Sequence, residues 1–131
     1  MPSTVALHEG DASQLQIAAQ LQDIVFVSTV FSSLLDDAFQ PQLAEAMWRW
    51  VKPGCVLWSE FTYDNPRNPG VHGMRLSRVR SLFPHGKIDA RRVTLAPPLS
   101  RRAVKVHDAA CRVLNSLPFL RTHLLCWIGK P

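Results

Sequence analysis

Glycine repeats, paired cysteines and long apolar runs are missing from this sequence, and each absence excludes a class of protein. The six glycines form no G-x-G-x-x-G repeat, the turn that binds a dinucleotide phosphate in α/β proteins. The three cysteines are widely scattered without a C-x-x-C pair, so the sequence predicts neither a disulfide framework nor a zinc site. We interpret all three as buried thiols: Cys55, Cys111 and Cys126.

No apolar run approaches the roughly 20 residues that a membrane-spanning helix needs. The first ten residues also lack the basic and apolar segments of a signal peptide. We therefore expect a soluble, cytoplasmic protein that does not contact a membrane. The histidines show no metal-ligand spacing, so we expect no metal site. They are His8, His72, His85, His107 and His123.

Positive charge is almost absent from the first 50 residues, which contain one basic residue and six acidic ones. Residues 51–131 contain fourteen basic residues and four acidic ones. A basic half can bind phosphate or an acidic substrate. Alternatively, it is a solvated surface that also attracts the acidic half of a neighbouring chain. No aromatic platform is interleaved among the arginines, which makes nucleic acid the least favoured partner.

Apolar runs separated by helical patterns predict an α/β fold. The runs that predict strands are residues 24–28, 56–61, 92–96 and 123–128, with a weaker candidate at 4–8. The first two of these runs are almost continuously apolar, as expected for parallel strands covered on both faces. The last strand follows a proline-containing segment, and we expect it to enter the sheet antiparallel.

Three segments predict helices: residues 41–51, 76–83 and 100–117. We expect the first helix to end at Lys52-Pro53-Gly54, because proline disfavours helical geometry before it and glycine supplies a turn. For the last helix the spacing predicts an inward face formed by Ala103, His107, Ala110, Leu114 and Leu117.

Four passages, in order, resemble the class I S-adenosylmethionine-dependent methyltransferases. GDAS at 10–13 is similar to the end of the family's third strand, DIVFVSTVF at 23–31 to its fourth strand, and WVKPGCVLWSEF at 50–61 to its helix, turn and fifth strand. TYDNPRNPGVHG, RRVTLAPPL and LPFLRTHLLCWIGKP resemble strings that follow the fifth strand in a bacterial branch of the family.

The resemblance implies a truncated Rossmann-like methyltransferase core, with a mostly parallel sheet and an antiparallel last strand. The whole chain, residues 1–131, would form a single partial domain that lacks the family's first two strands. Those strands carry the GxGxG turn and the ribose-binding acid of the donor site, and neither lies in this sequence. The missing strands would leave an open edge from Ile24 to Ser28. We expect a homodimer through this edge or through exchanged N-terminal segments, or a second chain that supplies the missing strands.

The resemblance implies cofactor contacts at two places in the sequence. Asp11, with Ala12, would approach the adenine of S-adenosylmethionine, although aspartate at this position also suits a turn or a helix cap. Ser28 and Thr29 would lie beside the donor sulfur, or would only satisfy backbone groups at the end of a strand.

The densest polar cluster follows the fifth strand of the family pattern, where loops carry substrate contacts. Methyl transfer requires alignment of donor and acceptor and, for a weak acceptor, removal of its proton. Glu60, Asp64 and His72 are the candidate catalytic residues. The candidate substrate contacts are Tyr63, Asn65, Arg67 and Asn68. The alternative is a pair of turns at residues 64–66 and 68–70, which the composition also predicts.

Three functions therefore stay open. The first is a methyltransferase-like protein that binds S-adenosylmethionine only when a partner completes the donor site. The second is an assembly or interaction module derived from a methyltransferase. The third is a basic anion or nucleic-acid binder, based on the nine cations between residues 75 and 105.

Overall fold

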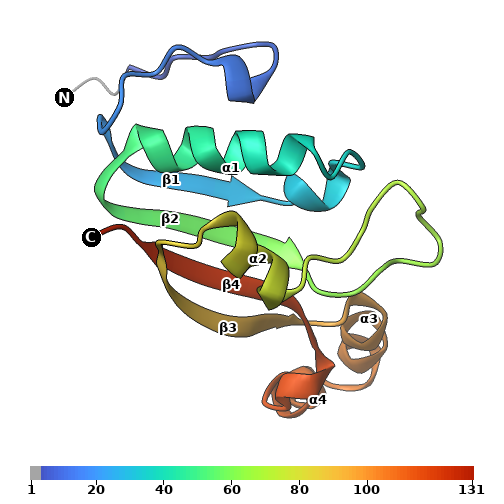
Figure 1. Cartoon of the computed structure of the whole chain (residues 1–131). Helices are drawn as coiled ribbons and strands as arrows, with labels where there is room; N and C mark the ends of the chain where they lie inside the picture. The colour runs from blue at the N-terminus through green and yellow to red at the C-terminus, as the bar shows by residue number, and fades with distance from the viewer. Residues whose placement is uncertain (1–3) are drawn as a thin grey trace.

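A computed structural model describes residues 4–131 and contains a four-stranded mixed sheet (Figure 1). The strands are β1 (Gln22–Ser28), β2 (Val51–Phe61), β3 (Lys87–Leu95) and β4 (Arg121–Gly129), in the order β1-β2-β4-β3. β1 and β2 are parallel, and β4 is antiparallel to both of its neighbours. Three strands therefore run in one direction and β4 runs against them. This confirms the expected α/β fold with an antiparallel last strand.

Two helices cover one face of the sheet, and two more lie at one of its ends. α1 (Phe39–Trp50) and α2 (Leu76–Leu82) pack on the face turned to the viewer in Figure 1. α3 (Pro97–Val106) and α4 (Asp108–Asn115) connect β3 to β4. The core lies between the sheet and the first two helices. In the part of the chain that the structure describes, no helix is long and apolar enough to cross a membrane.

The weak strand candidate at residues 4–8 is wrong. This segment runs as irregular backbone, with Val5 and Leu7 exposed by 76% and 92%. A strand needs a neighbour for its backbone hydrogen bonds, and in the described residues β1 is the last strand on that side of the sheet. The four stronger candidates are confirmed, and every one of them extends further than its apolar run.

The turn expected at Lys52-Pro53-Gly54 is also wrong, because these residues belong to β2. α1 ends at Trp50, and Val51 pairs at once with Gln22. The register then shifts, bringing the Asp23 carbonyl oxygen to 2.6 Å from where a Cβ on residue 54 would lie. The glycine is therefore required by close approach of two backbones. At the same register shift, the Lys52 ammonium of β2 lies 2.6 Å from the Asp23 carboxylate of β1.

The single helix expected at residues 100–117 is two helices that meet at His107. This residue has extended backbone, with φ −171° and ψ 143°, and its ring Nδ1 accepts the Ala109 N–H at 3.0 Å. At this break the His107 ring accepts a hydrogen bond from an N–H group in the first turn of α4, which has no acceptor within the helix. Of the expected inward face, Ala103 is buried but His107 is exposed. Cys55 and Cys126 are buried as expected, whereas Cys111 is only half-buried.

Gly54→Ala is expected to destabilise the chain by about 2 kcal/mol, because the added methyl meets the Asp23 carbonyl and β1 must shift away from β2. Urea unfolding followed by circular dichroism measures this change. Gly129→Ala on β4 is the matched control, since its Cβ would make only ordinary contacts, the nearest at 3.6 Å. A Gly54→Ala variant as stable as the control would contradict the close approach.

Candidate functional site

The carboxyl ends of β1 and β2 form the rim where an α/β sheet of this kind binds ligands. Phe61, at the end of β2, pairs with His123 near the start of β4, and Leu95, at the end of β3, pairs with Arg121. The connection through α3 and α4 therefore lies at the same end of the sheet. Two further segments meet there: the turn η2 (Phe31–Ser33) after β1, and the loop at residues 62–74 after β2.

Glu60, one of the candidate bases, is fully buried beneath η2. Its Oε1 accepts the Phe31 backbone N–H at 2.8 Å, which ties the end of β2 to the turn that follows β1. Its Oε2 and the Ser32 hydroxyl are buried without a hydrogen-bond partner of standard geometry. A carboxylate in this position can hold the turn in place, but it does not reach the surface where an acceptor would bind.

Burial raises the pKa of Glu60 above its usual range, because removal from water penalises the charged form. The Ser32 hydroxyl and the N–H groups of Val30, Phe31 and Ser32 oppose this shift by stabilising the carboxylate. Desolvation dominates. The site therefore contains a buried acid with a raised pKa, which lies beneath the turn η2 at the sheet rim.

A second buried polar contact to η2 was not predicted from the sequence. Gln40, 4% exposed on the inward face of α1, donates from its amide to the carbonyls of Phe31 and Leu34 at 3.4 and 3.2 Å. Arg78 of α2 donates to the Gln40 Oε1 at 3.0 Å. The sequence did contain a signal, because Gln40 lies among the apolar positions of a helix. A buried glutamine is almost always hydrogen-bonded, so its position indicates a polar contact inside the fold.

Ser28 and Thr29 lie at the rim, as the resemblance implies. Ser28 is half-buried at the end of β1, and Thr29 is exposed with φ +53°, an uncommon backbone conformation for a β-branched residue. The Thr29 hydroxyl donates to the Ser28 carbonyl at 2.8 Å, and the Thr29 N–H donates to the Ser59 carbonyl at 3.0 Å. Asp64 and His72, the other candidate catalytic residues, lie on the loop at residues 62–74. A backbone hydrogen bond joins this loop to η2.

Asp64 and His72 lie together at the neck of the loop at residues 62–74. Asp64 Oδ1 accepts the Gly73 N–H at 2.7 Å and lies 4.0 Å from His72 Nδ1. Both side chains are more than 60% exposed. The His72 backbone N–H donates to the Ser32 carbonyl at 2.8 Å, so the loop is fixed to η2. An exposed carboxylate beside an imidazole can accept a proton from a bound ligand.

The candidate substrate residues divide into turn-forming and open side chains. Asn65 and Asn68 accept the N–H groups of Arg67 and Gly70 at 3.0 and 3.1 Å, which favours the turn interpretation of both asparagines. The Arg67 side chain is exposed. Tyr63 is half exposed, and its hydroxyl accepts from Arg92 at 2.9 Å. Tyr63 thus joins the loop to Arg92 on β3.

Asp11 and Ala12 lie on a separate segment. Asp11 caps the turn η1 (Ala12–Gln14), accepting the Ser13 N–H at 2.8 Å and the Ser13 hydroxyl at 2.7 Å on the same oxygen. This geometry matches the cap interpretation of Asp11. The Asp11 side chain is exposed.

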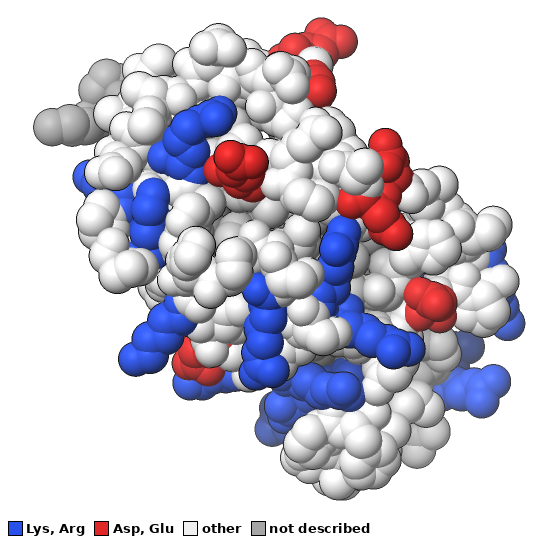
Figure 2. All heavy atoms as spheres, in the orientation of Figure 1, with Lys and Arg blue, Asp and Glu red and all other residues white. Residues whose placement is uncertain are grey.

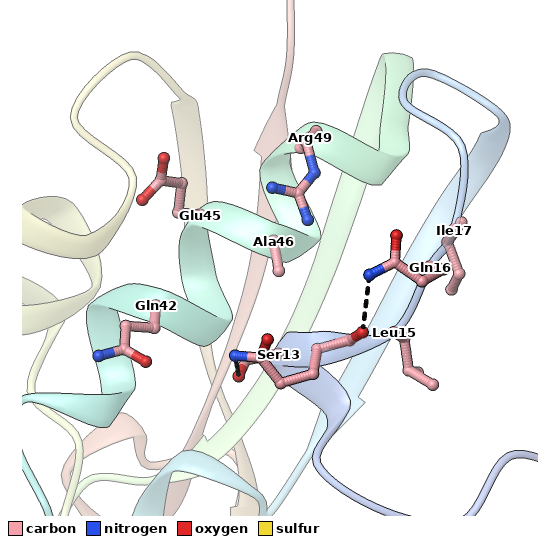
Figure 3. Close-up of a pocket in the computed structure, with 9 residues that line it drawn as sticks. Ser13, Leu15, Gln16, Ile17, Gln42, Glu45, Ala46 and Arg49 are labelled. Carbon is pink, nitrogen blue, oxygen red and sulfur yellow. Dashed lines mark hydrogen bonds between the residues drawn. The ribbon is translucent and has the colours of Figure 1, made fainter.

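A hollow lies between the η1 segment and α1, away from the rim (Figure 3). It encloses about 460 Å³ and is lined largely by exposed polar side chains, including Gln42, Glu45 and Arg49 of α1. The Gln16 amide donates to the Gln14 carbonyl at 3.4 Å, so this side chain binds within its own segment. We regard the hollow as a gap beneath a loosely packed segment. In the described residues, no group of three or more histidine, cysteine or acidic side chains could hold a metal.

The charge asymmetry of the sequence is visible on the surface. Figure 2 shows lysine and arginine gathered over the lower half of the molecule, where Figure 1 places β3 and α3. The acidic side chains lie mainly in the upper half. The β1 side of the molecule is therefore mainly acidic, and the β3 side is mainly basic.

No protein-family model matches the chain, and no curated protein matches its sequence. Solved structures do match its fold. An S-adenosylmethionine-dependent methyltransferase from Archaeoglobus fulgidus matches 94% of this chain and 66% of its own, with a TM-score of 0.66 and 12% identity. One from Methanosarcina mazei matches 92% and 65%, with a TM-score of 0.64 and 14% identity.

A possible histamine N-methyltransferase from Thermotoga maritima matches 97% of this chain and 65% of its own, with a TM-score of 0.68 and 9% identity. These likenesses show that the chain has a class I methyltransferase-like fold. The chain spans about two thirds of the length of these structures.

The described residues contain only part of what a donor site in this fold would need. Ser28 and Thr29 lie at the rim, but beyond β1 the described residues contain no strand that could carry a glycine-rich turn. Asp11 is bound within its own turn. The described chain alone therefore does not fit S-adenosylmethionine.

Glu60→Gln is expected to gain stability relative to the parent protein as pH rises. Because burial raises the pKa of Glu60 in the folded state, folding favours its protonated form. The parent protein therefore loses this contribution as pH rises through the raised pKa, whereas glutamine stays neutral and still accepts the Phe31 N–H. Urea unfolding at pH 5 and about pH 8 measures the difference.

The exposed Glu45→Gln is the matched control, and its effect should not vary with pH in this way. Relative to Glu60→Gln, Glu60→Ala should cost about 2 kcal/mol at either pH, since it leaves a buried N–H without an acceptor. If the parent protein instead became more stable relative to Glu60→Gln as pH rises, folding would favour ionised Glu60. That result would contradict the raised pKa.

Proposed function

We propose that this chain is an S-adenosylmethionine-dependent methyltransferase-like protein that cannot bind its donor alone. A second polypeptide would pair with β1 and supply the glycine-rich turn. The observation that carries this proposal is the rim itself, where the methyltransferase-like fold presents Ser28, Thr29, Asp64 and His72 beside a strand with one free edge.

The backbone of β1 is suited to accept another strand. The Thr29 N–H bonds to β2, and N–H directions alternate along a strand. The N–H and carbonyl groups of Ile24, Phe26 and Ser28 therefore point away from β2, towards the free edge. No proline or lysine lies on this strand to block pairing. The second polypeptide could be another copy of the chain or a different one.

The residues at the rim would act by alignment and proton removal. S-adenosylmethionine, when bound, supplies an activated methyl group. Ser28 or Thr29 would orient an acceptor hydroxyl, and Asp64 or His72, both exposed, would accept its proton. Glu60 would act indirectly as a positioning residue, because it holds η2 through the Phe31 N–H.

The second candidate function is an interaction module, which is favoured by the exposed apolar side chains on the sheet. Ile24, Phe26 and Trp127 are exposed by 55%, 63% and 51%. A module of this kind would retain the fold for assembly without donor binding. The basic binder is the least supported hypothesis, and a steep salt dependence of binding would be its signature.

Isothermal titration of the purified chain with S-adenosylmethionine and S-adenosylhomocysteine is expected to give no binding signal, because the wall of the donor site is missing. Micromolar binding by the chain alone would contradict the proposed incompleteness and would justify a screen of methyl acceptors.

The second arm co-purifies the chain with the product of an upstream reading frame that encodes a strand and a GxGxG turn. This complex is expected to bind S-adenosylhomocysteine with micromolar affinity. Thr29→Val is expected to retain the complex but weaken this binding, while Glu45→Gln, at an exposed position of α1, should change neither. A stable complex without donor binding would favour the interaction module.

A further inference from the structure

Arg92 lies on the helix side of the sheet, at the level where β2 ends. It pairs with Leu124 of β4, and Leu124 pairs with Glu60 of β2. Paired residues on neighbouring strands share a face, and Leu124 and Glu60 are both buried on the side of the helices. Figure 2 views this side and shows lysine and arginine gathered where Figure 1 places β3. Arg92 therefore belongs to a basic surface beside the rim.

The loop after β2 holds the Arg92 guanidinium in place. Its Nη1 donates to the Tyr63 hydroxyl at 2.9 Å, and its Cζ lies 5.8 Å from the centre of the Tyr63 ring. A cation at this distance from an aromatic ring is attracted to it. A guanidinium has several N–H donors, and within the described residues the Arg92 side chain forms this hydrogen bond alone. Most of its donors therefore remain available to a ligand.

The charge of Arg92 is not compensated by a carboxylate. In the part of the chain that the structure describes, Arg92 forms no ion pair. Its neighbour Arg91 lies 3.6 Å from the Asp89 carboxylate, and Arg78 is bound to Gln40 at 3.0 Å. Arg92 thus differs from both, because it is held by a neutral partner that leaves its charge free to attract an anion.

Arg121 is a second fixed cation at this corner of the sheet. Its Nε donates to the Asn115 carbonyl at 2.6 Å, and its Nη1 donates to the Arg92 carbonyl at 3.1 Å. Arg121 also has no carboxylate partner among residues 4–131. Two neighbouring arginines without a counter-charge raise the local positive potential, and an anion bound there would interact favourably with both. The corner between β3 and the loop after β2 therefore favours an anionic group.

The candidate base adjoins this corner. Asp64 follows Tyr63 directly in the chain, and its Oδ1 accepts the Gly73 N–H at 2.7 Å, which offsets part of its negative charge. Consecutive Cα atoms are only about 3.8 Å apart. One small molecule can therefore reach Arg92 with an anionic end and Asp64 or His72 with a nucleophilic end.

We propose that Arg92, held by Tyr63, binds the anionic group of a small methyl acceptor, a carboxylate or a phosphate. A guanidinium suits both groups, because its parallel N–H donors match two oxygens. The assignment of the anion to a methyl acceptor rests on the proposed function. Binding of the anion itself requires neither the methyl donor nor a second polypeptide, so it is tested on the chain alone.

Tyr63 supplies the reporter for this test, because it is the only tyrosine in the sequence. With ¹³C-labelled tyrosine, all ring resonances in the NMR spectrum belong to this residue. The probes are benzoate and phenyl phosphate, and benzamide is the neutral control of similar shape. At least one anion is expected to shift the Tyr63 resonances saturably, at millimolar concentration or below, whereas benzamide should not. The anion that binds more tightly identifies the group that the site favours.

Arg92→Gln is expected to weaken binding of the anion by about tenfold or more, because it removes the charge and the paired donors. Arg91→Gln is the matched control. It removes the same charge from the adjacent position, but Arg91 points to the opposite face of the sheet and already pairs with Asp89. This control should keep nearly the full affinity. Circular dichroism verifies that both variants fold.

Two results would overturn the proposal. One is the absence of a saturable shift with either anion. The other is an equal loss of affinity in Arg91→Gln and Arg92→Gln, which would indicate a diffuse basic surface without a defined site. Failure of the proposed function appears instead in the donor titrations described above, so the two failures are distinguishable. Anion binding through Arg92 in a complex that never binds the donor would overturn only the assignment to a methyl acceptor.

Discussion

The packing of Trp58 on the helix side of β2 is the contact on which the rest of the structure depends. Its ring lies 4.2 Å from that of Phe31 in η2 and 5.9 Å from that of Phe83, which follows α2. One buried side chain therefore fixes the turn after β1 and the helix after β2 against the same strand. Two residues further along β2, Glu60 binds the Phe31 backbone. Apolar packing and a buried hydrogen bond thus hold the same turn, and the rim geometry follows from both.

The order and type of the elements could be predicted from local sequence, but the ends of the strands could not. Apolar runs identify the part of a strand that packs in the core. Residues 51–55 and 87–91 join their strands because neighbouring strands offer backbone partners, and such pairing is not encoded in their own composition. The same reason explains the failure at residues 4–8, where Val5 and Leu7 suit a strand but have no neighbour to pair with.

The contacts of the candidate site residues could not be predicted from the sequence, because they join segments that lie far apart along the chain. Glu60 is buried because η2, almost 30 residues earlier, folds over it. Gln40 supports the same turn from α1. Asn65 and Asn68 form local turns, and here composition was sufficient, because these hydrogen bonds span two residues. Prediction from sequence was therefore adequate for interactions within a segment and inadequate for those that join segments.

Completion of the donor site would use the face of the sheet opposite α1 and α2. A strand paired parallel to β1 and followed by a glycine turn opens a helix, and that helix must pack on one face of the sheet. On the near face α1 already lies beside β1, whereas the far face offers Phe26, Leu57 and Trp127. A completing helix would therefore pack over these three side chains. Under the proposed function, the completed protein would bury an apolar surface that the described residues alone leave partly exposed.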